Sequence, residues 1–241
     1  MKYYVTSDTH GFYSLLVDKL KECGWYEDSQ PHKLIICGDI MDRGEEALKM
    51  QEFVSDLLKK NEIILIKGNH EWLFEYLVGK DEGIAYYHHC CNGTFGTLCQ
   101  LTGCTQYSEH NERALAGKKT NFYLQIIPAC VNYFETEHYI FTHGWIPRGK
   151  YWRKDDEHIW ERVASWKNGM REYKHKDAYH TDGKTVVCGH WNTSYGHVRA
   201  GKCKTERGND AIFDPYIDEG IIALDANTAF SGKMNMIILE D

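Results

Sequence analysis

Short apolar runs that each end in a tight polar turn are the strongest constraint on the fold of this chain. The turns combine Gly with Asp, Asn or His, and they are Ser7-Asp8-Thr9-His10-Gly11, Gly38-Asp39-Ile40-Met41-Asp42-Arg43-Gly44, Gly68-Asn69-His70-Glu71, Thr142-His143-Gly144 and Gly189-His190-Trp191-Asn192. A short apolar run bounded by such turn residues is typical of a buried strand. In an α/β sheet the carboxyl ends of the strands line the ligand crevice. We therefore expect these polar side chains to converge in space.

The first part of the chain alternates strand-like runs with amphipathic segments. Strands are predicted over 2–7, 33–37 and 62–67, and helices over 12–23, over 45–60 and from 71 to 78. This β-α-β-α-β rhythm predicts an α/β fold with a largely parallel sheet covered by helices.

The middle and the end of the chain have a weaker periodicity. Residues 79–117 are rich in Gly, Cys, His, Asn and Thr, which favours a partly helical cap or lid over a site. The remaining predictions are an antiparallel strand pair over 130–135 and 139–142, a helix over 159–166, a strand over 185–188, a surface loop over 201–218 and a closing hairpin of 221–225 with 234–239.

Composition limits the class of protein. A length of 241 residues favours a single domain over residues 1–241, with 79–117 as an insertion within it. The net charge of -7 argues against a binder of long nucleic acids that works through general phosphate attraction. No apolar run approaches the roughly 18 residues of a membrane span, and Met1 leads directly into a strand-like run without a signal-peptide pattern. We expect a cytoplasmic protein with no membrane partner.

The nine cysteines are best explained as reduced thiols, because their number is odd and no export signal is evident. Cys37 and Cys188 lie inside apolar runs and are predicted to be buried as small hydrophobic residues. A second group clusters in the cap segment without a CxxC pair, which leaves a structural zinc site as a minor alternative. This group is Cys90, Cys91, Cys99 and Cys104.

The residue types in the polar turns indicate metal chemistry. Carboxylate, amide and imidazole donors without thiolates suit Mn²⁺, Fe or Zn²⁺. Alternation along an extended strand end points the side chains of Asp8 and His10 to the same side, as a shared ion requires. Six such ligands are too many for one catalytic ion, whereas two ions that share a carboxylate use them well and suit phosphoester displacement. Any one of these motifs alone is common, but five in this order are not.

In their order, the segments DTHG, GDIMDRG, GNHE, FTHG and VVCGH resemble the metallophosphoesterase (calcineurin-like) superfamily. Arg43-Gly44 after Asp42 is characteristic of its phosphoprotein phosphatase branch, which includes small bacterial and phage Ser/Thr phosphatases and symmetrical diadenosine tetraphosphate hydrolases. The likeness spans residues 8–190. It implies an αββα sandwich with a dinuclear metal centre at one edge, which replaces the single parallel sheet.

The resemblance also implies roles for individual residues. Asp39 would bridge two divalent ions, and a hydroxide between the ions would be the nucleophile. His70 matches the general acid, Asp42 the carboxylate that orients it, and Arg43 the phosphate-binding arginine. The implied ligands are Asp8, His10 and Asp39 for the first ion, and Asp39, Asn69, His143 and His190 for the second.

Weaker correspondences concern substrate binding. Asn92-Gly93-Thr94 is similar to the family's Asn-Gly-Gly segment near the phosphate, with Thr94 in place of the second glycine. Arg162 in Ile159-Trp160-Glu161-Arg162 matches a second phosphate-binding arginine, and Arg148 competes for that role. Many members of the superfamily have a second histidine ligand where this chain has Asn192, and the phosphatase branch also lacks that histidine. The pattern gives no support for placing His197 in the metal shell.

The leading prediction is a manganese-dependent Ser/Thr protein phosphatase-like phosphomonoesterase. Hydrolysis of diadenosine tetraphosphate or another nucleotide is the alternative. It requires a nucleoside pocket, which the cap or aromatic residues would have to supply, the candidates being Trp145, Trp160, Trp191 and Tyr195. A catalytically silent scaffold that binds a phosphorylated partner is a third option, although every implied metal position holds a competent residue. The partner in each case is a phosphorylated protein or a nucleotide.

Overall fold

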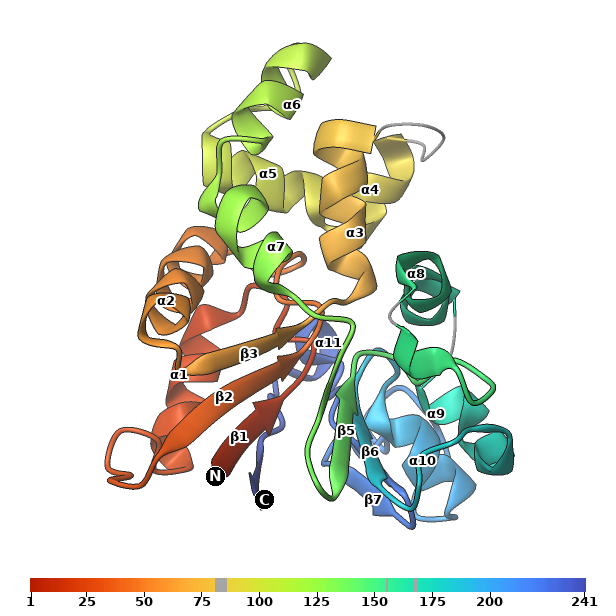
Figure 1. The fold of residues 1–241 in the computed structure, drawn as a ribbon. Helices are drawn as coiled ribbons and strands as arrows, with labels where there is room; N and C mark the ends of the chain where they lie inside the picture. The colour runs from red at the N-terminus through yellow and green to blue at the C-terminus, as the bar shows by residue number, and fades with distance from the viewer. Residues whose placement is uncertain (81–85, 155, 167–168) are drawn as a thin grey trace.

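Two β-sheets packed face to face form the centre of the structure, with helices on both outer faces (Figure 1). The computed structural model describes residues 1–80, 86–154, 156–166 and 169–241. Within these residues the order of layers is helix, sheet, sheet, helix, which confirms the αββα arrangement.

The first sheet has the strand order β3-β2-β1-β9. Strands β1 (Lys2–Thr6), β2 (His32–Cys37) and β3 (Ile63–Ile66) are parallel, and β9 (Ile237–Glu240) runs antiparallel to β1. Helices α1 (Tyr13–Glu22) and α2 (Ala47–Lys60) connect the parallel strands, as the alternating pattern predicted.

The second sheet has the strand order β4-β5-β6-β8-β7. Its parallel centre is β5 (Tyr139–Thr142), β6 (Thr185–Cys188) and β8 (Ile221–Ala223). The edge strands β4 (Tyr133–Glu135) and β7 (Tyr216–Asp218) are antiparallel to their neighbours. The outer helices on this side are α8 (Glu157–Trp166), α9 (Gly169–Glu172) and α10 (Thr193–Arg199), with short 3-10 helices at Trp152–Lys154 and Tyr173–Ala178.

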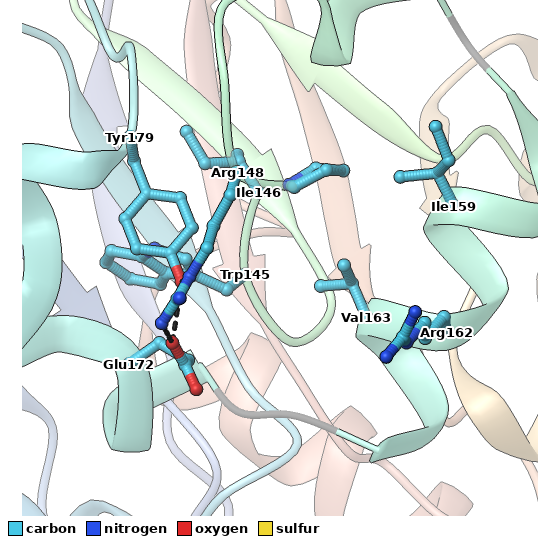
Figure 2. A pocket seen from close by; sticks show the side chains of 9 residues that line it. Trp145, Ile146, Arg148, Ile159, Arg162, Val163, Glu172 and Tyr179 are labelled. Carbon is cyan, nitrogen blue, oxygen red and sulfur yellow. Dashed lines mark hydrogen bonds and ion pairs between the residues drawn. The ribbon is translucent and has the colours of Figure 1, made fainter.

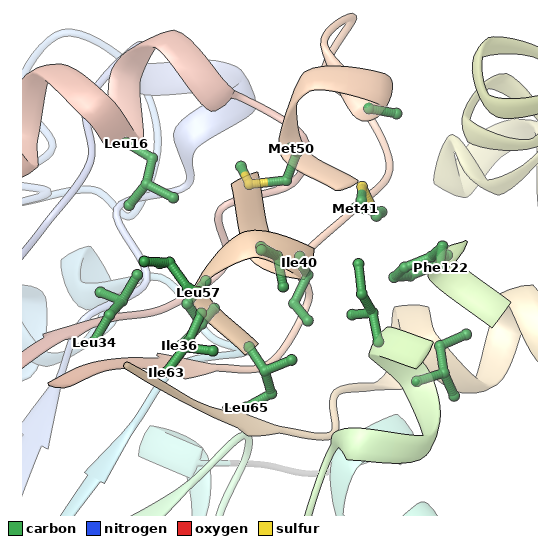
Figure 3. Close-up of a cluster of buried hydrophobic side chains, with 14 of the residues drawn as sticks. Leu16, Leu34, Ile36, Ile40, Met41, Met50, Leu57, Ile63, Leu65 and Phe122 are labelled. Atoms are coloured by element: carbon green, nitrogen blue, oxygen red, sulfur yellow. The ribbon is translucent and has the colours of Figure 1, made fainter. Parts of the chain in front are cut away.

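Alternation along the strands divides the buried side chains among three layers. Val5 and Ile35 point between the sheets toward Phe141 and Val187. Their sequence neighbours point the other way, so the outer face of the first sheet packs against α1 and α2 through residues such as Leu16, Leu34, Ile36, Met50, Leu57 and Leu65 (Figure 3). The corresponding outer cluster of the second sheet contains Trp145, Trp152 and Trp160. Cys37 and Cys188 are fully buried, as predicted.

Two predictions for the C-terminal part were wrong. The segments 221–225 and 234–239 do not form a hairpin, because β8 pairs with β6 and β7 whereas β9 crosses to the other sheet and pairs with β1. Helix α11 (Thr228–Ser231), with left-handed residues at Asn227 and Gly232 on either side, carries the chain across. The predicted loop 201–218 ends in strand β7. Apolar patterns identified most of these strand residues but not their partners.

Helices of the segment 69–129 stand above the first sheet (Figure 1). They are α3 (Asn69–Glu75), α4 (Tyr86–Asn92), α5 (Thr94–Thr102), α6 (His110–Gly117) and α7 (Ile127–Ala129), with π-helical turns at Tyr76–Lys80 and Phe122–Ile126. Residues 81–85 of the predicted cap lie outside the described residues. In the described part of the chain, none of the helices combines the length and the apolar character that crossing a membrane requires.

Candidate metal centre and active site

The turns after β1, β2, β3, β5 and β6 meet where the two sheets come together. Backbone hydrogen bonds join them within each sheet, from His10 N to Asp39 O at 2.9 Å and from Gly189 N to His143 O at 2.7 Å. Two further bonds connect the sheets: His143 Nδ1 lies 2.8 Å from Cys37 O, and His190 N donates to Asp8 Oδ2 at 2.9 Å. The predicted convergence of polar strand ends is therefore present.

One cluster of ligand atoms surrounds the His143 imidazole. Its Nε2 lies 3.1 Å from Asn69 Oδ1, 3.2 Å from His190 Nδ1 and 3.3 Å from Asp39 Oδ1. The Nδ1 of His143 faces a backbone carbonyl that can only accept, so Nδ1 carries a proton, and in the neutral ring that a metal ion binds Nε2 presents its lone pair to the cluster. The donor types and the direction of this lone pair fit a divalent cation.

A second cluster consists of His10, Asp39 and His70, whose candidate ligand atoms all lie within 4.8 Å of one another. His10 Nδ1 faces the Met41 carbonyl at 3.0 Å, which again leaves a lone pair on Nε2. Asp8 lies beside this cluster, with Oδ1 4.0 Å from His10 Nε2. Asp39 belongs to both clusters, as a bridging carboxylate would.

The Arg43 guanidinium lies against the Nε2 atoms of His10 and His70. Its Nη1 lies 2.8 Å from His10 Nε2, and its Nη2 lies 3.3 Å from His70 Nε2. Donation from Arg43 to the unprotonated His10 Nε2 places a positive charge at the second cluster, where a metal ion would also be favoured.

His70 is fixed by Asp42 and two threonines. His70 Nδ1 lies 2.6 Å from Asp42 Oδ2, while the hydroxyls of Thr94 and Thr97 donate to the two oxygens of this carboxylate at 2.8 and 2.6 Å. All four side chains are buried. The threonines come from α5, so a helix of the predicted cap holds Asp42, which in turn holds His70 with Nε2 toward the cleft.

Burial and close charges set the protonation of the site. Burial raises the pKa of Asp39, but the neighbouring His143 and His70 outweigh it, and the pKa lies well below its ordinary value. Burial lowers the pKa of His143, but the Asp39 carboxylate outweighs it and raises this pKa to about 10. For His70 the effects of Asp39 and Asp42 likewise exceed that of burial, and its pKa is raised. Asp39 thus attracts positive charge from several sides.

Backbone strain is concentrated at the same turns. Among the described residues, most of the non-glycine residues with left-handed backbone belong to the predicted site: Asp8, His10, Asp39, Asp42, Arg43 and His190. Such conformations are costly and persist at functional sites where the surrounding structure imposes them. Gly93 also has a positive φ, of 87°, and a Cβ there would lie 2.4 Å from the Arg43 backbone nitrogen. A glycine is therefore required at this position of the Asn-Gly-Thr segment.

The clusters open into a cleft of about 700 Å³. Predicted site residues that line it are Asp8, Asp39, Arg43, Asn69, His70, Asn92 and His190. His10, Asp42 and His143 lie buried among them. Asn192 lines the cleft as well, whereas His197 is buried against Tyr216, with Nε2 3.0 Å from the Asp214 carbonyl.

Several residues of the site were missed in the sequence. Asp225 lines the cleft directly after an apolar run, the same signal as in the other turns, but it was included in a predicted hairpin strand. Glu71 is fully buried and accepts hydrogen bonds from the backbone of Gly68, Asp39 and Ile40 at 2.8–3.0 Å, so it ties two turns together. Arg207 lines the cleft from a polar loop without any distinguishing pattern.

Arg162 and Arg148 lie apart from the residues that line the cleft. Both contribute to another pocket, beside Trp145 and Tyr179 (Figure 2). Cys90 and Cys91 are exposed on α4, and Cys99 and Cys104 are half-buried. None of the candidate ligand groups in the described residues contains a cysteine.

Comparison with known proteins agrees with the motifs. The model for the calcineurin-like phosphoesterase family matches residues 1–202. This protein belongs to the calcineurin-like phosphoesterase family. Membership confirms the resemblance inferred from the five turns, and the matched range includes their convergent polar residues.

The curated relatives align over part of their length. The asymmetrical bis(5'-nucleosyl)-tetraphosphatase PrpE of Bacillus cereus (strain Q1) is 35% identical over 94 residues, which span 36% of this chain and 38% of that protein. Serine/threonine-protein phosphatase 1 of Salmonella typhimurium is 35% identical over 68 residues, 28% of this chain and 29% of that protein. The likeness to these two relatives is therefore confined to a minority of each sequence.

Solved structures support the fold over the whole chain. The cold-active protein-tyrosine phosphatase of a psychrophilic Shewanella species superposes with a TM-score of 0.58 at 16% identity, covering 100% of this chain and 75% of that one. A protein serine/threonine phosphatase from Saccharomyces cerevisiae gives a TM-score of 0.51 at 17% identity, covering 79% and 61%. At these identities the likeness concerns the fold alone.

Proposed function

We propose that this protein is a divalent-metal-dependent phosphoester hydrolase, a phosphomonoesterase of the Ser/Thr protein phosphatase type. The observation that carries the proposal is the meeting, in one cleft, of two ligand clusters sharing Asp39, an arginine, and a histidine bound to a buried carboxylate. Family membership supports it.

The residues that would hold the metal ions come from the two clusters, with Asp8 added beside the second cluster and His70 left free to act on the substrate. Asp8, His10 and Asp39 would hold one ion, and Asp39, Asn69, His143 and His190 the other. Bound divalent ions would activate a water molecule and neutralise charge on the phosphoryl oxygens. We propose Mn²⁺ as the native metal, and Fe or Zn²⁺ suits the same donors.

Three further residues would act on the substrate. Arg43, which contacts His10 and His70 of the second cluster, would clamp two phosphoryl oxygens with its planar guanidinium. His70 would donate a proton from Nε2 to the departing oxygen, while Asp42 holds Nδ1 and favours the protonated ring. Asn92 lines the same cleft and would contact the phosphoryl group.

Dinucleoside tetraphosphate hydrolysis is the second candidate, with the phosphoryl chemistry unchanged. The cleft, at about 700 Å³, has room beyond a phosphoryl group, and Trp191, Phe230 and Arg207 line it together with the predicted site residues. These aromatic rings and this cation could receive a nucleoside and a second phosphate. The likeness to a bis(5'-nucleosyl)-tetraphosphatase supports this candidate.

The test is a reconstituted assay of wild type and His70→Asn. Protein stripped of metal and reloaded with Mn²⁺ is given an aryl phosphate, a phosphothreonine peptide and diadenosine tetraphosphate. We expect chelator-sensitive turnover with the peptide preferred. His70→Asn should lower kcat by roughly 10²–10⁴ while the metal content stays constant, because a general acid is lost and no ligand is removed.

Each alternative result has a distinct meaning. A preference for the dinucleotide would establish the second candidate. Loss of both metal and activity in His70→Asn would identify His70 as a ligand. Absence of turnover with every substrate, despite bound metal, would contradict the proposal and leave a binding role.

A further inference from the structure

A second pocket, of about 330 Å³, lies between helix α8 and the chain that follows β5 (Figure 2). Ile159, Arg162 and Val163 of α8 form one side, and Arg148, Glu172 and Tyr179 form the opposite side. Trp145, Ile146 and Pro147 complete the lining. A cavity of this size and apolar character is typical of a site for one apolar group.

The charges on the two sides of this pocket differ. Arg148 is neutralised, because its Nη2 lies 2.5 Å from Glu172 Oε2 and its Nε donates to Tyr179 Oη at 3.2 Å. Arg162 is exposed, and no ion pair of its guanidinium with an acidic group is found in the described part of the chain. The pocket therefore combines an apolar interior with one uncompensated positive charge.

The polar groups of the lining favour an alkyl side chain over a nucleobase as the occupant. The groups on the Arg148 side are already engaged with one another, since Tyr179 Oη also donates to Glu172 at 2.8 Å. Against the Arg148 side, the polar edge atoms of a base would lose water without gaining partners, which costs free energy. An aliphatic side chain has no such atoms.

Two short segments connect the lining of the pocket to the lining of the active-site cleft. Trp145 is two residues from the candidate ligand His143 along the chain. Helix α9 touches both sites, because Glu172 lines the pocket while the guanidinium of Arg171 lies 3.6 Å from the ring centre of Trp191, which lines the cleft. A Cβ on Gly169 would lie 2.3 Å from the Gly144 carbonyl oxygen, so this helix packs directly on the turn that carries His143.

We propose that this pocket is the subsite for an apolar side chain flanking the phosphorylated residue of a peptide substrate, with Arg162 paired to an acidic residue beside it. The inference rests on the proposed phosphatase function and adds a substrate class to it. A peptide in the cleft advances about 3.3–3.6 Å per residue, so a neighbouring side chain can reach a pocket that starts two residues from His143.

The experiment compares peptides rather than absolute rates. Phosphothreonine peptides that differ only in one Leu or Ala, scanned on both sides of the phosphothreonine, are assayed with the Mn²⁺-loaded protein. We expect kcat/KM for the best Leu peptide to exceed that of its Ala counterpart by roughly 10- to 100-fold, the discrimination an apolar pocket provides. Ile159→Glu should bring this ratio close to one.

A matched variant controls for the new surface charge. Ile159 is 46% exposed on α8 and Leu115 is 57% exposed on α6, so either residue accepts Glu without disturbing the core. Leu115→Glu should keep the Leu-to-Ala ratio of wild type. An unchanged ratio in Ile159→Glu, or no Leu preference in wild type, would overturn the inference while leaving the phosphatase function intact.

A second variant tests the charge. Arg162→Gln should reduce, by about tenfold, the kcat/KM advantage of peptides that carry an Asp next to the favoured Leu. Turnover of an aryl phosphate is the reference for this comparison. If aryl phosphate and peptide turnover fall by the same factor, Arg162 acts on the phosphoryl group and its place in this subsite is refuted. If Ile159→Glu impairs only the dinucleotide substrate, the pocket binds a nucleoside and the peptide assignment fails. Absence of turnover for every substrate would instead refute the proposed function itself.

Discussion

The two sheets contribute to the site by the same route but supply different chemistry. The turns of the first sheet provide carboxylates, an amide, an arginine, the His10 imidazole and the His70–Asp42 pair, whereas the turns after β5 and β6 of the second sheet provide the imidazoles of His143 and His190. Groups proposed to act on the phosphoryl group thus lie on one side. The second sheet completes the metal clusters and, in our proposal, reads the rest of the substrate.

The hydrophobic clusters on the outer faces of the two sheets also differ in composition. The first is mostly aliphatic and covered by long regular helices, and the second is rich in Trp and Tyr under shorter ones. Rigid aliphatic packing suits turns that must hold strained residues such as Asp39 and Arg43 in place. Large aromatic side chains leave a pocket beside Trp145 that a ligand can enter.

The largest expected effect comes from the carboxylate that joins the two clusters. Asp39→Asn should lower the affinity for both metal ions and reduce kcat by more than about 100-fold, since even outer-shell groups typically cost 10- to 100-fold. His190→Asn, on the second sheet, should release mainly one ion. Metal content by mass spectrometry of dialysed protein, with Asp28→Asn as a distant control, checks this. Equal metal loss in Asp39→Asn and His190→Asn would contradict the proposal that Asp39 binds both ions.

A smaller effect is expected from helix α5. Thr97→Val removes a hydroxyl that donates to the Asp42 carboxylate and accepts from the Asp42 backbone nitrogen, and it should lower kcat about tenfold with little change in KM, because bonds that position Asp42 and through it His70 are lost. Thr97→Ser should restore kcat. Thr102→Val, the same substitution in the same helix, is the control, since the Thr102 hydroxyl donates to the Leu98 carbonyl and accepts from the Cys104 backbone nitrogen, without contact to Asp42. If Thr97→Ser is as slow as Thr97→Val, the hydroxyl is not what matters.

Sequence reasoning succeeded where one local signal determines the outcome. An apolar run that ends in a polar turn identified the strand ends, and the order of the motifs led to the family. Asp225 follows the same rule and was still missed, because the run before it was assigned to a hairpin. Strand pairing was the source of this error, since an apolar edge such as β9 fits either sheet until the whole fold is known.

Other features could not have been predicted from the sequence. The contact between Thr97 and Asp42 joins residues 55 positions apart, and it depends on how α5 lies over the turn after β2. Arg162 was matched from its local motif, yet its direction depends on the placement of α8 relative to the chain after β5. The left-handed backbone of Asp8 and His190 is imposed by packing around the turns, because neither residue type requires it.

The smallest effect concerns an ion-pair cluster at the edge of the second sheet, away from the site. The Glu135 carboxylate accepts from Arg153 Nε and Nη2 at 2.9 and 2.8 Å and lies 2.8 Å from Lys184 Nζ. The pKa of Glu135 is lowered from 4.5 to about 2, mainly by the hydrogen bonds from Arg153 and further by Lys184. Since the folded-state pKa is depressed, the stabilisation is fully present above pH 4.5 and is lost as the pH falls toward 2.

Glu135→Gln should therefore cost about 1 kcal/mol at pH 7 and progressively less below pH 4.5. Urea unfolding at a series of pH values measures this difference, with Glu112→Gln, an exposed acid on α6, as control. A destabilisation of Glu135→Gln that is independent of pH would show that the carboxylate acts through packing and not through its charge.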